Sequence, residues 1–101
     1  MAHSTSRHSM DDQMADAIVL ANECHDTCLM TITYCLEQGG EHAAPEHIRL
    51  MLDCVDICRT AAAFMLRDSD LQGRVCAVCA EVCDACADDC ARFTGDERMQ
   101  A

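Results

Sequence analysis

Apolar and small residues recur every three or four positions along three long segments of this chain. This spacing places the side chains on one face of an α-helix, with polar residues on the opposite face. The pattern predicts helices over about residues 9–38, 45–68 and 70–93. No segment alternates with the period of two that a half-buried strand requires. The chain is therefore predicted to be all-α.

Cysteines occupy many of the stripe positions where a helical bundle usually carries leucine. The first stripe is Met14, Ala17, Ala21, Cys24, Cys28, Thr31 and Cys35. The second is His47, Met51, Cys54, Cys58, Ala61 and Met65. The third is Cys76, Cys79, Cys83, Cys86 and Cys90. All three stripes are expected to face one interior, which would then be lined by thiols.

Local signals mark the predicted helix boundaries. Gly39 and Gly40 end the first helix, and Pro45 suits the first turn of the second. Three patterns resemble a capping box, in which Ser or Thr precedes an acidic residue or Gln by three positions: Ser9 with Asp12, Ser69 with Gln72, and Thr94 with Glu97. The last predicts a fourth helix from Asp96, although the chain ends at Ala101.

Three long helices joined by short loops predict an antiparallel up-down bundle. Residues 1–8 are expected to be a disordered tail, and residues 9–101 a single cysteine-lined bundle domain. Three stripes around one axis leave one side open. The fourth helix of such a bundle is expected to be absent or to be supplied by a partner chain.

Ten cysteines in 101 residues would suggest disulfides in a small secreted protein. The polar segment 1–16 lacks the apolar core of a signal peptide, and no apolar run is long enough to span a bilayer. The cytoplasm is therefore the expected compartment, where dense cysteines indicate metal or redox chemistry. The net charge of −11 disfavours nucleic acid and anionic membranes as partners.

A lining of thiols and thioethers is a set of soft donors, which favours Cu(I) and also suits Zn(II) and iron–sulfur clusters. Structural zinc sites use separate groups of four ligands, and iron–sulfur clusters need four converging thiolates. A continuous ladder of thiols along helices fits neither pattern well. Because two thiolates suffice for Cu(I), binding of several Cu(I) ions per chain is the leading hypothesis. Its candidate ligands are Cys24, Cys28, Cys35, Cys54, Cys58, Cys76, Cys79, Cys83, Cys86, Cys90 and His47.

Four segments carry a resemblance to a known family: YCLEQGG at 34–40, PEHIRL at 45–50, DCVDIC at 53–58 and CAVCAEVCDAC at 76–86. The sequence resembles the cytosolic four-helix-bundle copper storage proteins over about residues 14–95. The resemblance implies a bundle that binds many Cu(I) ions, mostly through two thiolates each, and homo-oligomers that are often tetramers. Some members have cysteine where this chain has Ala17, Ala21 and His47, which implies a lower capacity here.

Several alternatives stay open at this level. His47 is either a ligand at the mouth of the bundle or a half-exposed histidine of the first turn. His25 and His42 are not expected to be ligands, and His42 is expected to be only a loop residue. A zinc-binding or purely structural helical oligomer is the second hypothesis for the whole chain.

A thiol oxidoreductase is the third hypothesis, because Cys76 and Cys79 form a Cys-x-x-Cys motif, as do Cys83 and Cys86. These motifs lie within a helix, whereas a redox motif is expected at a helix N-terminus beside a βαβ unit. No nucleophile–base pair is visible either. The chain is therefore predicted not to be an enzyme.

Overall fold

Three long α-helices and a short fourth one make up residues 11–100, the part of the chain that the computed structural model describes. They are α2 (Asp12–Gln38), the 3-10 turn η1 (Gly40–Ala43), α3 (Pro45–Leu66), α4 (Gln72–Ala91) and α5 (Glu97–Gln100). No β-strand occurs within these residues. The prediction of an all-α helical bundle is therefore confirmed, and the tail predicted for residues 1–8 lies outside the described residues.

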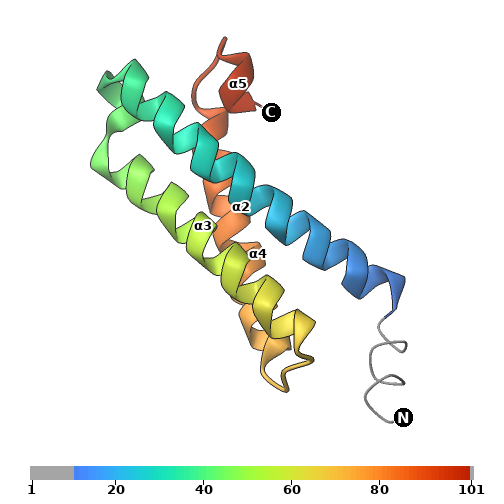
Figure 1. Ribbon diagram of the computed structural model, residues 1–101. Coiled ribbons are helices and arrows are strands. Elements are labelled where there is room, and N and C mark those ends of the chain that lie inside the picture. Colours follow the sequence, from blue (N-terminus) through green and yellow to red (C-terminus); the bar gives the residue numbers. More distant parts are fainter. Residues whose placement is uncertain (1–10, 101) are drawn as a thin grey trace, which may run out of the picture.

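The helix α3 is the central element of the bundle. It packs along both α2 and α4, whereas α2 and α4 hardly touch each other through their backbones. Figure 1 shows α2 and α3 running side by side, with α4 behind them and α5 at the end of the bundle where α2 finishes. One flank of α3 is thus covered by α2 and another by α4, and a gap separates these two outer helices.

The first long helix starts two residues later than the proposed cap at Ser9 would require. The N-cap is Asp11, whose side-chain Oδ1 accepts a hydrogen bond of 2.7 Å from the backbone N–H of Met14. Aspartate is among the preferred N-cap residues because its carboxylate satisfies a backbone N–H of the first turn. Ser9 itself lies outside the described residues. At the other end Gly39 adopts φ +69°, which places its N–H on the carbonyl of Cys35.

The capping box predicted for the third long helix is wrong. The helix α4 begins at Gln72 with Leu71 as its N-cap, and Ser69 belongs to the preceding turn. There the Ser69 hydroxyl accepts a hydrogen bond from the N–H of Leu71, and the Gln72 amide donates to the Asp68 carboxylate. The side chain of Gln72 therefore supports the turn. The helix also ends at Ala91, two residues before the predicted end at 93.

The short helix α5 begins close to the predicted position, but its cap differs from the predicted one. Oδ1 of Asp96 accepts hydrogen bonds from the backbone N–H groups of Arg98 and Met99, so Asp96 caps the helix in place of Thr94. Gly95, at φ +81°, makes the turn that leads into it. As a result α5 folds back onto the bundle and buries Met99.

The core is built around α3 and contains unusually small and soft side chains. The largest fully buried side chains are Met51, His47, Cys35, Cys54 and Cys58, of which all but Cys35 belong to α3. Cysteine packs as a small apolar residue, so thiols can fill the space between helices that leucine would otherwise occupy. The bundle therefore buries thiols as structural side chains and at the same time places sulfur atoms of different helices next to one another.

Candidate metal centre

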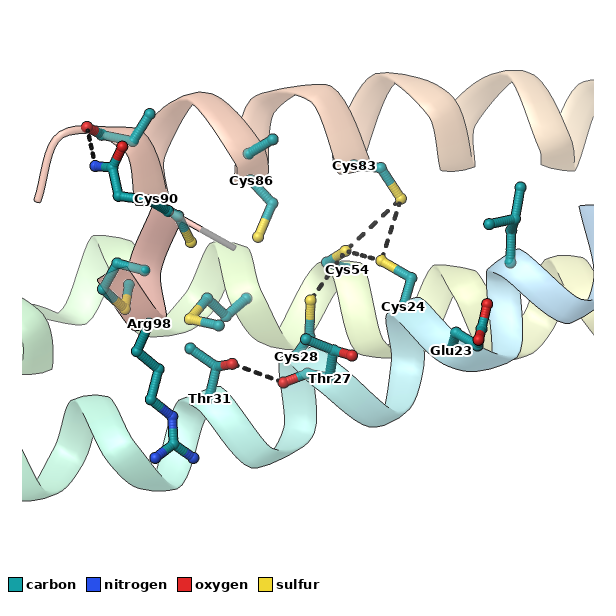
Figure 2. Close-up of a pocket in the computed structure, with 16 residues that line it drawn as sticks. Glu23, Cys24, Thr27, Cys28, Thr31, Cys54, Cys83, Cys86, Cys90 and Arg98 are labelled. Atoms are coloured by element: carbon teal, nitrogen blue, oxygen red, sulfur yellow. Dashed lines mark hydrogen bonds between the residues drawn. The ribbon is translucent and has the colours of Figure 1, made fainter. Parts of the chain in front are cut away.

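A groove opens between α2 and α4, with α3 as its floor and α5 at one end. Its volume is about 400 Å³. Figure 2 shows the side chains of the three long helices pointing toward one another in it, with Arg98 of α5 beside them. Six cysteines line the groove: Cys24, Cys28, Cys54, Cys83, Cys86 and Cys90. It lies where the backbones of α2 and α4 stay apart, and all of its thiols from these two helices except that of Cys86 are only partly buried.

A first group of four thiols comes from all three long helices. The sulfur atoms of Cys24, Cys54, Cys58 and Cys83 all lie within 4.8 Å of one another. Cys54 lies 3.6 Å from Cys24 and 3.7 Å from Cys83, and Cys58 lies 3.5 Å from Cys83. Four thiolates around a tetrahedral ion with bonds of about 2.3 Å would be about 3.8 Å apart. These spacings therefore match the size of a metal–thiolate site.

A second group shares one sulfur with the first. Cys28, Cys54 and Cys86 lie within 4.8 Å of one another, and Cys28 is 3.6 Å from Cys54. Because Cys54 belongs to both groups, the two form one continuous cluster along the bundle. Cys79 extends it in the other direction, at 3.8 Å from Cys58 and 3.9 Å from Cys83.

The remaining two cysteines of α4 lie at the margins of this cluster. Cys76 and Cys90 are partly buried and pack against the core, but neither belongs to the two groups of thiols. Along the whole of α4 only Cys86 is fully buried, with 4% of its surface exposed. The sequence predicts that three stripes around one axis leave one side of the bundle open, and most of the α4 stripe is only partly covered, along the groove.

The thiols of the cluster differ in their acidity. Hydrogen bonding with Cys54 and Cys86 lowers the pKa of Cys28 to about 5, well below the ordinary thiol value of 9.0. A hydrogen bond from Cys86 also lowers the pKa of Cys90. Burial instead raises the pKa of Cys24. A thiol with the pKa of Cys28 is mostly thiolate at neutral pH, so the apo cluster holds a thiolate at Cys28.

At the loop end of the bundle Cys35 meets His47. Cys35 has 0% and His47 1% of its surface exposed, and Cys35 Sγ lies 3.4 Å from Nε2 of the imidazole. The alternative that His47 is half-exposed is therefore wrong. The other ring nitrogen, Nδ1, donates a hydrogen bond of 2.5 Å to the carboxylate of Asp89. Burial, and then the negative charges of Cys90 and Asp96, raise the pKa of Cys35 to about 11.

A hydrogen-bonded cluster that sequence reasoning missed closes the same end. Asp96 accepts hydrogen bonds of 2.7 Å from the Tyr34 hydroxyl and 2.9 Å from Nε2 of His42. The ring of His42 also packs against Phe93, with ring centroids 4.2 Å apart. The expectation that His42 is only a loop residue is wrong. Its position between the first two helices gave no sign that residues after α4 would return to it.

All ten cysteines are free thiols. A helical bundle in which free thiols of different helices gather at contact distance defines a class of proteins that can hold soft metal ions. Comparison with known proteins then identifies the family of the chain. Residues 10–101 match the family model described as copper storage protein, and the chain belongs to this family.

Two relatives illustrate the similarity. The chain is 35% identical over 86 residues to the uncharacterized cysteine-rich protein YhjQ of Bacillus subtilis, an alignment that covers 84% of this chain and 80% of YhjQ. The crystal structure of the Nmul_A1745 protein of Nitrosospira multiformis superposes with a TM-score of 0.82 at 43% identity, and covers 89% of this chain and 84% of that one. The helical arrangement described above is thus shared with a solved structure.

Proposed function

We propose that this chain stores or buffers several Cu(I) ions in the cytoplasm, and that it holds them through the cysteine thiolates of the groove. The observation that carries the proposal is the continuous cluster of thiols that share Cys54. Thiolate is the ligand that selects Cu(I), and a continuous cluster can hold ions side by side, whereas isolated four-ligand sites hold one each. Membership of the copper storage family supports the same assignment.

The chemistry is the exchange of protons for metal ions. Each thiol must lose its proton to become a ligand, so loading with Cu(I) releases protons and depends on pH. The thiolate at Cys28 provides a ligand that is already deprotonated on the wall of the groove. The oxidation state of copper does not change. We propose storage, and not catalysis, as the role of this exchange.

Zinc is the second candidate cargo, because one observation favours it specifically. The spacing of Cys24, Cys54, Cys58 and Cys83 suits a single tetrahedral ion as well as it suits part of a Cu(I) cluster. Zinc at this position would occupy one site per chain and leave the other thiols without a metal. The two cargoes therefore differ in stoichiometry as well as in preference.

The test is an anaerobic titration of the reduced protein with Cu(I) against a chromogenic Cu(I) chelator, repeated with Zn(II). We expect several tightly bound Cu(I) ions per chain and weaker binding of Zn(II). The double variant Cys83→Ala/Cys86→Ala should bind fewer Cu(I) ions, by at least about one per chain, because it removes one thiol from each group. Its helicity, measured by circular dichroism, should be largely retained.

Cys76→Ala is the matched comparison, since Cys76 lies on the same helix but outside both groups. It should lower the capacity less than the double variant does. Unchanged stoichiometry in the double variant would remove α4 from the storage site. At most one Cu(I) per chain, or a preference for Zn(II), would favour the zinc hypothesis.

We further propose that the protein is a homo-oligomer and that each of its copies binds copper ions. Large apolar side chains on α2 are more than half exposed, namely Val19, Leu20, Met30 and Leu36, and a second copy could cover them. Nucleic acid and membranes are not proposed as partners, given the charge of −11. Among the described residues no helix is both long and apolar enough to cross a bilayer. Light scattering coupled to size-exclusion chromatography would measure the number of copies of this chain in the proposed homo-oligomer.

A further inference from the structure

Three different soft donors meet at the loop end of the bundle, away from the groups of thiols. Sγ of Cys35 lies 3.4 Å from Nε2 of His47 and 3.5 Å from Sδ of Met99. All three side chains are buried, with 0%, 1% and 4% of their surfaces exposed. They come from α2, α3 and α5, so the short C-terminal helix completes the set. Cys35 belongs to neither group of thiols described above.

The imidazole of His47 is held so that one nitrogen points at the cysteine. The carboxylate of Asp89 can only accept, so Nδ1 carries the hydrogen of that bond and Nε2 is the nitrogen that faces Cys35. Arg92 in turn donates a hydrogen bond of 2.7 Å to the other oxygen of Asp89. Histidines that bind metals commonly donate their second N–H to a carboxylate in this way, which fixes the ring and raises its basicity.

The sulfur of Cys35 contacts both of the other donor atoms. The Cys35 S–H donates to Sδ of Met99, and Nε2 of His47 lies within hydrogen-bonding distance of the same sulfur. A single S–H satisfies only one acceptor well, and the site is too buried for bulk water to serve the other. A cation in place of that proton would accept the lone pairs of all three atoms at once.

We propose that Cys35, His47 and Met99 form a separate three-coordinate Cu(I) site, with Asp89 as the residue that positions the imidazole. One thiolate, one imidazole and one thioether are soft donors that suit Cu(I), and they contain no oxygen ligand for a hard ion. Binding removes the Cys35 proton to solvent and adds one Cu(I), with no change of oxidation state. The site deepens the proposed storage function and rests on it. The copper ion of this site would be bound by one nitrogen and two sulfur atoms, whereas the ions proposed for the groove are bound by sulfur alone.

The test follows His47 directly by NMR of protein labelled with ¹⁵N-histidine. On addition of Cu(I) we expect the Nε2 signal to move from the position of a free lone pair to that of a metal-bound nitrogen, while Nδ1 keeps its proton. Met99→Leu should raise the Cu(I) concentration needed for this change, because leucine fills similar space without a donor atom. Met65→Leu is the matched control, since Met65 is an equally buried methionine near the far end of α3. Met65→Leu should leave the Cu(I) concentration at which the Nε2 signal moves the same as in the unsubstituted protein.

Asp89→Asn tests the positioning role separately. It should weaken the binding seen at Nε2 by about 10- to 100-fold, the usual effect of losing such a partner, and should free Nδ1 to exchange its proton. An Nε2 signal that stays unmoved in protein carrying several Cu(I) ions would overturn this site and leave storage intact. Absence of any bound Cu(I) would overturn both. Equal behaviour of Met99→Leu and Met65→Leu would remove Met99 from the site.

Discussion

Neighbouring sulfur atoms decide how reactive each thiol of the groove is. Cys24 and Cys28 are one turn apart on α2, are both partly buried, and both line the groove. Yet hydrogen bonding with Cys54 and Cys86 lowers the pKa of Cys28, whereas burial raises that of Cys24. Two cysteines that look equivalent in the sequence therefore differ in acidity because of their local surroundings between the same helices.

This difference predicts selective alkylation of the apo protein at pH 6. Iodoacetamide should modify Cys28 at least about tenfold faster than Cys24, since a thiol with a pKa of about 5 is mostly thiolate at that pH and the gain exceeds its lower intrinsic nucleophilicity. The rate at Cys28 should fall as the pH is lowered through 5. Peptide mapping by mass spectrometry after short anaerobic exposure measures both rates. Equal labelling of the two cysteines would contradict the assigned thiolate.

At the scale of the element, one carboxylate makes several of the hydrogen bonds that hold α5 in place. Asp96 caps the helix through the N–H groups of Arg98 and Met99, and accepts hydrogen bonds from Tyr34 and His42. The hydrogen bond from Tyr34, followed in size by that from His42, holds the pKa of Asp96 below its ordinary value. One side chain thus both starts the helix and ties it to the rest of the bundle.

Asp96→Ala should therefore release α5 while the three long helices stay folded. We expect the amides of Arg98 and Met99 to lose their protection against hydrogen exchange, and the stability of the long helices to change little. Tyr34→Phe is the control, because it removes one hydrogen bond and leaves the cap in place. It should weaken protection by roughly the net value of one hydrogen bond, about 1 kcal/mol. Full protection in Asp96→Ala would show that α5 is held by packing alone.

The helices could be predicted from the sequence because their signals are local. Spacings of three and four fix the buried face of each helix, and Gly39 and Pro45 act on their own neighbours. The partners across helices could not be predicted in this way. A stripe does not say how far each helix is rotated or shifted, so it could not predict that Cys54 is shared by two groups. Likewise Tyr34 and Asp96 are 62 residues apart, and no local pattern joins them.

At the scale of the whole molecule, the groups of thiols proposed to bind metal come together only when the bundle is folded. Each group draws sulfur atoms from more than one helix, so unfolding separates the ligands. A ligand that binds the folded state stabilises it by about 2.7 kcal/mol per site when its free concentration is a hundred times its dissociation constant. The proposed loading with copper would therefore stabilise the folded state.

We accordingly expect each strongly occupied Cu(I) site to raise the melting temperature of the reduced protein by about 10–20 °C, given the usual shift of about 4–8 °C per kcal/mol for a domain of this size. Anaerobic thermal unfolding followed by circular dichroism measures the shift. A strong Cu(I) chelator should reverse it. Mg(II) is the control for simple neutralisation of the acidic surface and should have a much smaller effect. An equal shift with Mg(II) would indicate that charge, and not the thiol cluster, is responsible.

The sulfur cluster also has a consequence for how an ion moves once it is inside. From Cys28 at the groove, successive sulfur contacts lead through Cys54 and Cys83 to Cys58 and Cys79, with neighbouring atoms 3.5–3.8 Å apart. An ion can bind the next sulfur before it leaves the previous one, so each step is an exchange of one ligand. We therefore expect migration along the bundle to need no opening of the backbone. The order in which the positions fill would then reflect their relative affinities, whichever sulfur an arriving ion meets first.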